Sequence, residues 1–209
     1  WLALKLAFRL GECRAVRPGD FHLFFRWGPA EGAYALGAAR PTAFVRGWVE
    51  LSTNRVRGPE GYVTKKPKSR KARKVPVPES LAWALLSFLD RDRPTLLADE
   101  TGRSLDGSGS RAPLQRLLRE VQTGLGMDVH TFHDLRNTCL ETWLVNGVKP
   151  WNVSFWGAHA EGSHMARVTR NHYTGMPEID WEDVPKMEAH RQKEQGAAVG
   201  EHATAKPES

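Results

Sequence analysis

Cysteine is scarce in this chain: Cys13 and Cys139 are the only two among 209 residues. Both lie in apolar stretches with helical spacing, so we expect two buried free thiols rather than a disulfide. Free thiols indicate a reducing compartment. No Cys and His residues have the spacing of a zinc site, and we therefore expect no structural metal.

Long hydrophobic runs are also missing from the sequence. No apolar stretch reaches the length that spans a membrane, and no signal peptide is visible. These absences argue against a membrane protein and favour a cytoplasmic one. The chain opens at Trp1, inside an apolar, helix-like run without an initiator Met, so we expect a truncated chain.

An excess of acidic charge is absent as well, because 24 Asp and Glu residues face 30 Lys and Arg residues, for a net charge of +6. This basic balance suits a polyanionic partner without identifying one. The length and the 40% hydrophobic content fit one domain with tails. Apolar residues become rare after Pro185, so we expect a folded domain over residues 1–184. Residues 185–209 should form a disordered tail with at most a short helix near Met187.

Hydrophobic periodicity divides the domain into helices and strands. Helices are expected over residues 1–17, Pro78–Leu89 and Pro113–Val121, after Pro150, and over His164–Tyr173. Strand candidates, separated by Gly/Pro turns, are Phe21–Trp27, Ala43–Leu51, Gly61–Val63 and Lys74–Val77. Gly28–Pro41 is expected to be a loop rich in Ala, Gly and Pro. These elements predict an α+β fold, mostly helical, with a small antiparallel sheet.

The sequence from Thr131 to Asn146 predicts a helix with clear ends. Thr131 and Asp134 have the spacing of a capping box, with Asp in place of the usual Glu or Gln. Asn146 and Gly147 form a C-terminal stop signal. The apolar stripe of this helix comprises Phe132, Leu135, Cys139 and Trp143.

His133 and Arg136 share a face of this helix, because residues three apart are neighbours. They flank the apolar stripe, so we expect both to be half-buried near the N-terminal end of the helix. That end favours an anion through its free N–H groups and its dipole. An imidazole and a guanidinium there indicate a phosphate site, although a His-x-x-Arg pair alone is more often ordinary surface chemistry.

A basic run connects the last two strand candidates, with seven Lys and Arg residues from Lys65 to Lys74. Such a run is compatible with a solvated hairpin tip and with a segment that contacts the phosphates of DNA. We predict a reactive lysine in this run and backbone-phosphate contacts from Lys65, Lys66, Arg70, Lys71 and Arg73.

Short sequence boxes with cationic and hydroxyl side chains occur in a fixed order along the chain. The first box is Ala7-Phe8-Arg9-Leu10-Gly11-Glu12, followed by Val16 and Asp20, and the second is His133-Asp134-Leu135-Arg136-Asn137-Thr138. The third is Gly157-Ala158-His159, and a stretch from Thr169 to Tyr173 closes the series. In this order the sequence resembles the catalytic domain of the tyrosine recombinases, the phage-integrase-like site-specific DNA recombinases.

The resemblance implies an enzyme that cuts and rejoins DNA through a 3′-phosphotyrosine intermediate, without a metal or other cofactor. Arg9 and Arg136 would clamp the phosphoryl oxygens of the transition state. Tyr173 would be the nucleophile, and His133 would accept its proton. The expected partners are double-stranded DNA and further copies of the chain, four of which would assemble on DNA.

Two more roles follow from the resemblance. Lys68 would protonate the leaving 5′-hydroxyl, because it lies at the matching distance before Arg73-Lys74-Val75-Pro76, the counterpart of the family's Arg-x-Val-Pro-like strand. Lys66 and Lys71 are the alternatives for that role. His159 would donate a hydrogen bond to a phosphate oxygen.

The sequence departs from the family pattern around the third box. That box has Ala158 where the family has Gly next to the His, and the connection from His159 to Tyr173 is longer than usual. His164 lies nearer the customary distance from Tyr173 and is therefore an alternative to His159. The family's N-terminal DNA-clamping domain and first catalytic helix are expected to lie outside this chain.

Two other functions are compatible with the same boxes. One is a decayed integrase remnant that binds DNA without cutting it. The other is a type IB topoisomerase-like enzyme, which uses similar chemistry to relax DNA. The Arg-x-Gly-Glu and His-x-Leu-Arg boxes favour the recombinase.

Overall fold

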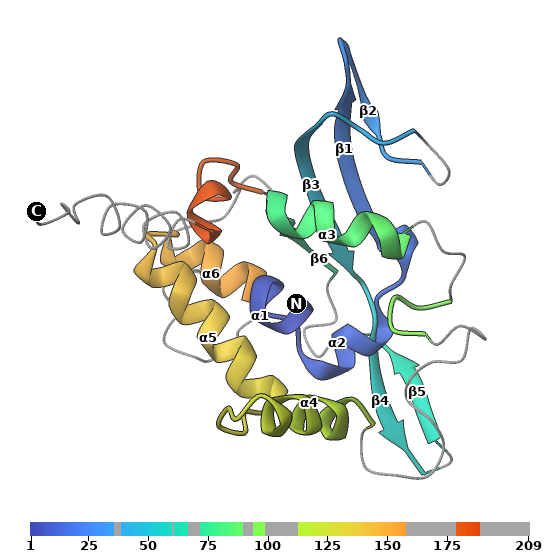
Figure 1. Cartoon of the computed structure of the whole chain (residues 1–209), viewed down its shortest axis with the longest axis vertical. Helices are drawn as coiled ribbons and strands as arrows, with labels where there is room; N and C mark the ends of the chain where they lie inside the picture. The colour runs from blue at the N-terminus through green and yellow to red at the C-terminus, as the bar shows by residue number, and fades with distance from the viewer. Residues whose placement is uncertain are drawn as a thin grey trace, which may run out of the picture.

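The computed structural model describes residues 1–35, 39–59, 61–66, 72–89, 94–98, 113–157 and 179–188. Its helices are α1 (Leu2–Leu6), α2 (Leu10–Ala15), α3 (Glu79–Leu89), α4 (Pro113–Gly124), α5 (Phe132–Val145) and α6 (Pro150–Gly157), with 3₁₀ turns η1 (Pro18–Asp20) and η2 (Pro185–Met187). Its strands are β1 (Phe21–Trp27), β2 (Ala30–Ala33), β3 (Ala43–Leu51), β4 (Asn54–Gly58), β5 (Gly61–Lys65) and β6 (Arg73–Pro76). The predicted α+β class, mostly helical with a small antiparallel sheet, is confirmed (Figure 1).

Four strands form the main sheet in the order β2-β1-β3-β6, and β4 pairs with β5 in a separate hairpin. All these pairings are antiparallel. Figure 1 shows the β1–β2 hairpin extending from one end of the molecule and the β4–β5 hairpin from the other. Strands β1 and β3 have the predicted bounds.

Two strands of the structure were not predicted from the sequence. Strand β2 lies inside Gly28–Pro41, which was expected to be a loop, and β4 has no counterpart among the strand candidates. The sequence of β2 is Ala-Glu-Gly-Ala, without β-branched or aromatic residues. Its backbone pairs with β1 from Ala30 to Ala33, so the neighbouring strand, rather than its own side chains, makes it extended.

The N-terminal helix expected over residues 1–17 is broken in two. Helix α1 ends at Ala7, which has φ 52° and ψ 33° in the left-handed region. Among the described non-glycine residues, Ala7 alone has a positive φ. The chain then turns through Phe8, and α2 begins after Arg9. The break has no Gly or Pro of its own, so periodicity alone predicts one continuous helix.

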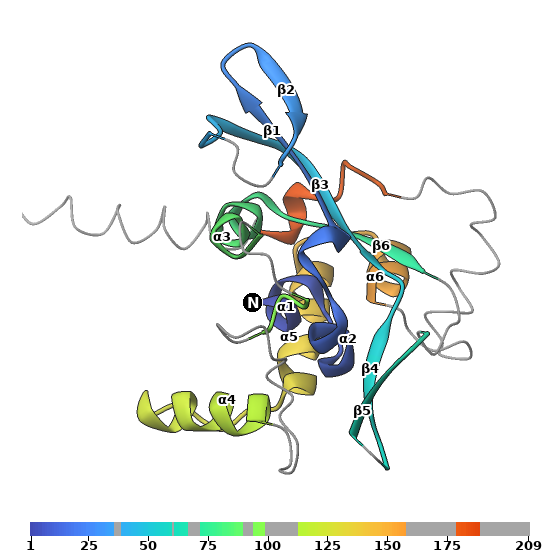
Figure 2. The ribbon, with the colours of Figure 1, turned by 90° about the vertical axis from the view of Figure 1, so that its right-hand side faces the viewer.

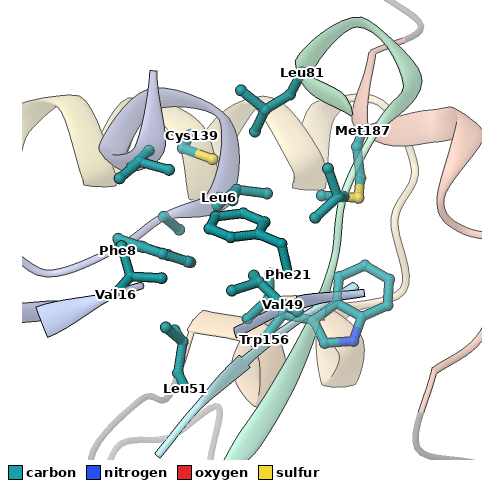
Figure 3. Close-up of a cluster of buried hydrophobic side chains, with 14 of the residues drawn as sticks. Leu6, Phe8, Val16, Phe21, Val49, Leu51, Leu81, Cys139, Trp156 and Met187 are labelled. Carbon is teal, nitrogen blue, oxygen red and sulfur yellow. The ribbon is translucent and has the colours of Figure 1, made fainter. Parts of the chain in front are cut away.

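The hydrophobic core lies between the helices and the main sheet. Figure 3 shows Leu6, Phe8, Phe21 and Val49 in this cluster, together with Trp156. Figure 2 shows α4 projecting from the body on the side of the N-terminus.

Both cysteines are buried in this core and free, as predicted. Burial raises the pKa of the Cys13 thiol and of the Cys139 thiol to about 12 in each case. Neither thiol is therefore a reactive thiolate near neutral pH.

The packed chain extends beyond the predicted domain boundary at residue 184. Met187 is buried and belongs to the core, and Glu188 accepts a hydrogen bond from the backbone N–H of Ser80 at 3.3 Å. The short helix expected near Met187 is present as η2. Met187 is a single apolar side chain in a polar stretch, so composition alone does not indicate that it packs against the core.

Candidate active site

Helix α5 begins with the predicted capping box. The Thr131 hydroxyl accepts a hydrogen bond from the Asp134 N–H at 3.2 Å, and the Asp134 carboxylate accepts one from the Thr131 N–H at 2.8 Å. These hydrogen bonds lower the pKa of the Asp134 carboxyl. The helix ends at Val145 with Asn146 as its C-cap, and Gly147 takes φ 82°, as the stop signal predicts.

Arg136 connects the boxes at the centre of the candidate site. It is 5% exposed, whereas the sequence predicted a half-buried side chain. Its Nη1 donates a hydrogen bond to the carbonyl of Ala7 and its Nη2 donates one to the carbonyl of Gly157. One guanidinium therefore joins the first, second and third boxes.

Arg9 lies next to this junction, at the N-cap of α2. Its Nη1 donates to Glu12 Oε1 at 3.3 Å, and about a third of its side chain (35%) is exposed. Burial and the nearby charge of Arg9 lower the pKa of Arg136 to about 10. Arg136 remains a cation at neutral pH, so two positive charges lie close together, as an anion site requires.

His133 is exposed on the first turn of α5, whereas the sequence predicted a half-buried side chain. Its position at the second residue of the helix points it away from the apolar stripe, which contains Phe132 and Leu135. The prediction that His133 lies near the N-terminal end of α5 is nevertheless correct.

Arg73 does not fit the predicted role of a DNA contact. Its side chain is 5% exposed and donates from Nη1 and Nη2 to the two carboxylate oxygens of Glu12, at 2.8 and 2.9 Å. Its Nε donates to the carbonyl of Trp156 at 2.9 Å. The side chain points inward because alternate residues of a strand face opposite sides, and the next residue, Lys74, instead lies over the Trp48 ring.

The remaining predicted residues fall into two groups. Lys65 and Lys66 are exposed at the end of β5, which suits the predicted contact with phosphates. The others lie outside the described residues: Lys68, Arg70, Lys71, His159, His164 and Tyr173.

Two residues of the first box make contacts with distant elements that sequence reasoning did not assign. Glu12 is 1% exposed and bonds to both Arg9 and Arg73. Gly11 lies against β4, since a Cβ there would be 2.0 Å from Asn54 Oδ1 and 2.8 Å from the Arg55 carbonyl oxygen. The position of Gly11 could have signalled its contact with β4, because a glycine inside a helix suggests close packing.

The part of the chain that the structure describes contains no group of His, Cys, Asp and Glu residues arranged to hold a metal ion. In the same residues no helix is both long enough and apolar enough to span a membrane.

Comparison with protein-family models and with curated proteins gives no match. Solved structures of the Tn1549 transposon integrase share the fold. In complex with a circular intermediate DNA, the integrase aligns with 93% of this chain at a TM-score of 0.54 and 15% identity. In complex with transposon right end DNA, it aligns with 94% of this chain at a TM-score of 0.53 and 15% sequence identity. The chain spans 56% and 57% of the length of those two structures. This chain therefore has the fold seen in the Tn1549 transposon integrase.

Proposed function

We propose that this chain is the catalytic domain of a site-specific DNA recombinase that cuts and rejoins DNA through a 3′-phosphotyrosine intermediate. The observation that carries the proposal is the junction at Arg136, which joins the first box at Ala7, close to Arg9, to the first residue of the third box, Gly157. Three sequence boxes that are far apart in the chain meet where two guanidinium groups lie close together.

In the cleavage step, the Tyr173 oxygen attacks a DNA phosphorus and the bond to the 5′-oxygen breaks. His133 accepts the tyrosine proton, and Lys68 gives a proton to the leaving 5′-oxygen. The product is a 3′-phosphotyrosyl ester and a free 5′-hydroxyl. Because the ester retains the bond energy, the reverse attack by a 5′-hydroxyl rejoins the strand without ATP.

The two arginines stabilise the charge that develops on the phosphoryl oxygens in this step. A guanidinium has five N–H donors. Hydrogen bonds to Ala7 and Gly157 fix the orientation of Arg136, and Glu12 holds Arg9. Preorganised donors of this kind stabilise a transition state more than they stabilise the substrate. His159, with His164 as the alternative, donates a further hydrogen bond to a phosphate oxygen. These side-chain cations supply the positive charge for the reaction, so the proposed mechanism needs no cofactor.

Double-stranded DNA is the proposed partner, and four copies of the chain assemble on it. The integrase structures with the same fold are complexes with DNA. Exposed Lys65 and Lys66, the following Arg70 and Lys71, and the net charge of +6 favour contacts with phosphates. We therefore propose a DNA-associated protein of the cytoplasm, whose affinity for DNA falls steeply with salt because bound counterions are released.

The test uses the Tyr173→Phe variant and a labelled pool of nicked random-sequence duplexes. A nick next to the cleaved bond lets the short 5′-hydroxyl strand diffuse away, which traps the covalent adduct. The wild-type chain should form an adduct that survives denaturation, and Tyr173→Phe should form none while binding the pool with unchanged affinity. The proposal is wrong if the adduct persists in Tyr173→Phe or maps to Tyr34 or Tyr62.

Two outcomes would support the alternative functions. Salt-dependent DNA binding without any wild-type adduct would indicate a non-catalytic remnant. Relaxation of supercoiled DNA without exchange of strands between two duplexes would indicate a topoisomerase-like enzyme.

A further inference from the structure

We infer that Arg73 is a positioning residue for the recombination chemistry, acting through Glu12 on Arg9 and through the Trp156 carbonyl on the third box. This inference rests on the proposed function. It replaces the DNA contact that the sequence suggested for Arg73, whose guanidinium lies inside the protein.

The first contact is a buried, two-pronged ion pair. Arg73 donates from Nη1 to Glu12 Oε1 at 2.8 Å and from Nη2 to Glu12 Oε2 at 2.9 Å. The two side chains are 5% and 2% exposed, so water does not compete for these bonds. A planar guanidinium matches a carboxylate in this geometry, whereas the single ammonium of lysine does not.

Glu12, held by Arg73, in turn fixes the position of Arg9. Its Oε2 also accepts the Arg9 backbone N–H at 2.8 Å, and its Oε1 accepts Arg9 Nη1 at 3.3 Å. The same two oxygens therefore hold a buried arginine on one side and the half-exposed, phosphate-binding arginine on the other. Burial alone would raise the pKa of the Glu12 carboxyl, but the hydrogen bonds and positive charges of Arg73 and Arg9 together outweigh burial and lower it, so Glu12 stays ionised.

The third donor of Arg73 reaches the other half of the site. Its Nε donates to the carbonyl of Trp156 at 2.9 Å, at the end of α6. The next residue, Gly157, bonds to Arg136 and leads directly to Ala158 and His159. Arg73 is also the first residue of β6, so it anchors the strand in which the basic run containing Lys68 ends.

A pair that served only folding would not need this arrangement. Buried ion pairs are replaceable by apolar residues with little loss of stability, because desolvation offsets their attraction. In this chain the charges of Glu12 and Arg73 hold a third charged side chain, Arg9, in place. The contact network therefore predicts that a change at Arg73 slows cleavage by moving Arg9, and that the effect depends on Arg9 being present.

The experiment measures adduct formation by Arg73→Lys, using the full chain, saturating DNA from the nicked random-sequence pool, and a temperature well below the unfolding midpoint of each variant. Arg73→Lys should lower the single-turnover rate on the order of 10- to 100-fold, since misplacement by about 1 Å has effects of that size. DNA affinity should stay within about twofold, because the side chain is buried and makes no phosphate contact. Arg46→Lys is the matched control, since Arg46 is an exposed arginine over the Phe24 ring and its change should leave the rate unaltered.

A double-mutant cycle separates positioning from folding. In an Arg9→Ala background, Arg73→Lys should cause a clearly smaller loss of rate than in the wild type, because the route through Glu12 has lost its target and only the contact with Trp156 remains. Glu12→Gln provides a second variant of the same connection, and it decides the matter if Arg73→Lys does not fold. Glu12→Gln should lower the rate of adduct formation when introduced into the wild-type chain and should leave the rate unchanged when introduced into the Arg9→Ala chain.

Three results would overturn the inference. The first is a folded Arg73→Lys variant that forms adduct at the wild-type rate. The second is a rate loss that is equally large with and without Arg9, for either variant. The third is absence of any adduct from the wild-type chain, which contradicts the proposed function itself and is recognised by the wild-type reaction alone.

Discussion

Arg136 donates a hydrogen bond to the carbonyl of Ala7, a residue 129 positions earlier in the chain. Ala7 is the point at which the N-terminal helix breaks, and its left-handed conformation turns its carbonyl group toward the guanidinium. The second hydrogen bond of Arg136 ends at Gly157, so the same side chain braces three elements. This contact is the reason that the first box and the α5 helix form one site.

Arg136→Lys should lower the free energy of unfolding by about 1–3 kcal/mol. Lysine keeps the positive charge but cannot reach both carbonyl groups, and a buried acceptor without a donor costs about that amount. The measurement is urea unfolding followed by circular dichroism. Arg116→Lys on α4 is the control, since its side chain is 67% exposed. Equal stability of Arg136→Lys and the wild type would show that the two hydrogen bonds do not support the fold.

Ala7→Val should destabilise the protein much more than Ala7→Gly. Glycine adopts the left-handed region readily, and its gain is offset by the loss of a buried methyl group, so we expect a net change within about 1 kcal/mol. A β-branched side chain is strongly disfavoured there, and Ala7 is fully buried. Thermal unfolding of the two variants checks this, and similar midpoints would argue against the helix break at Ala7.

Asp183→Asn should lower the free energy of unfolding at neutral pH and make that free energy depend less on pH in the acid range. Asp183 is fully buried and accepts hydrogen bonds from the Lys149 N–H at 2.8 Å, Asn152 Nδ2 at 2.7 Å and Lys186 Nζ at 2.6 Å. Burial alone would raise the pKa of the Asp183 carboxyl, but these hydrogen bonds outweigh it and lower the pKa below 3.8. A lowered pKa in the folded state stabilises the protein above pH 3.8, and this contribution is lost as the pH falls further.

The corresponding measurement is the unfolding free energy of wild type and Asp183→Asn from neutral pH down to acid. The variant should be less stable by about 1–3 kcal/mol near pH 7, because part of the carboxylate's hydrogen bonding is lost. The gap should narrow below the folded pKa. Glu182→Gln is the control, since that side chain is 86% exposed. A gap that stays constant down to acid pH would mean that Asp183 is not ionised in the folded state.

Truncation at two nearby positions should give different results. A chain that ends at Glu188 should keep the wild-type stability, because the residues beyond it are polar and poor in apolar anchors. A chain that ends at Val184 should lose about 2–5 kcal/mol, the usual effect of removing a buried Met side chain, since Met187 is 4% exposed. Thermal unfolding of both chains provides the measurement, and equal midpoints would contradict the burial of Met187.

Local signals in the sequence predicted those elements whose own residues decide their conformation. Strands β1 and β3 have alternating or aromatic residues over their whole length, and both have the predicted bounds. The capping box of Thr131 and Asp134 begins α5 at the expected residue. The order of the boxes was also sufficient to indicate the fold, because each box is short and continuous.

Contacts between distant residues decided what the sequence did not reveal. The left-handed turn at Ala7 is sterically unfavourable for alanine by itself, and it is held by Arg136. Strand β2 is extended because it pairs with β1. Arg73 belongs to a run of cations whose composition predicts an exposed segment. In the structure, the register of β6 turns its guanidinium inward to Glu12, 61 residues away, while Lys74 lies over the Trp48 ring. A buried charge depends on a partner from another element for its stabilisation, and that partner is brought to it only when the whole chain folds.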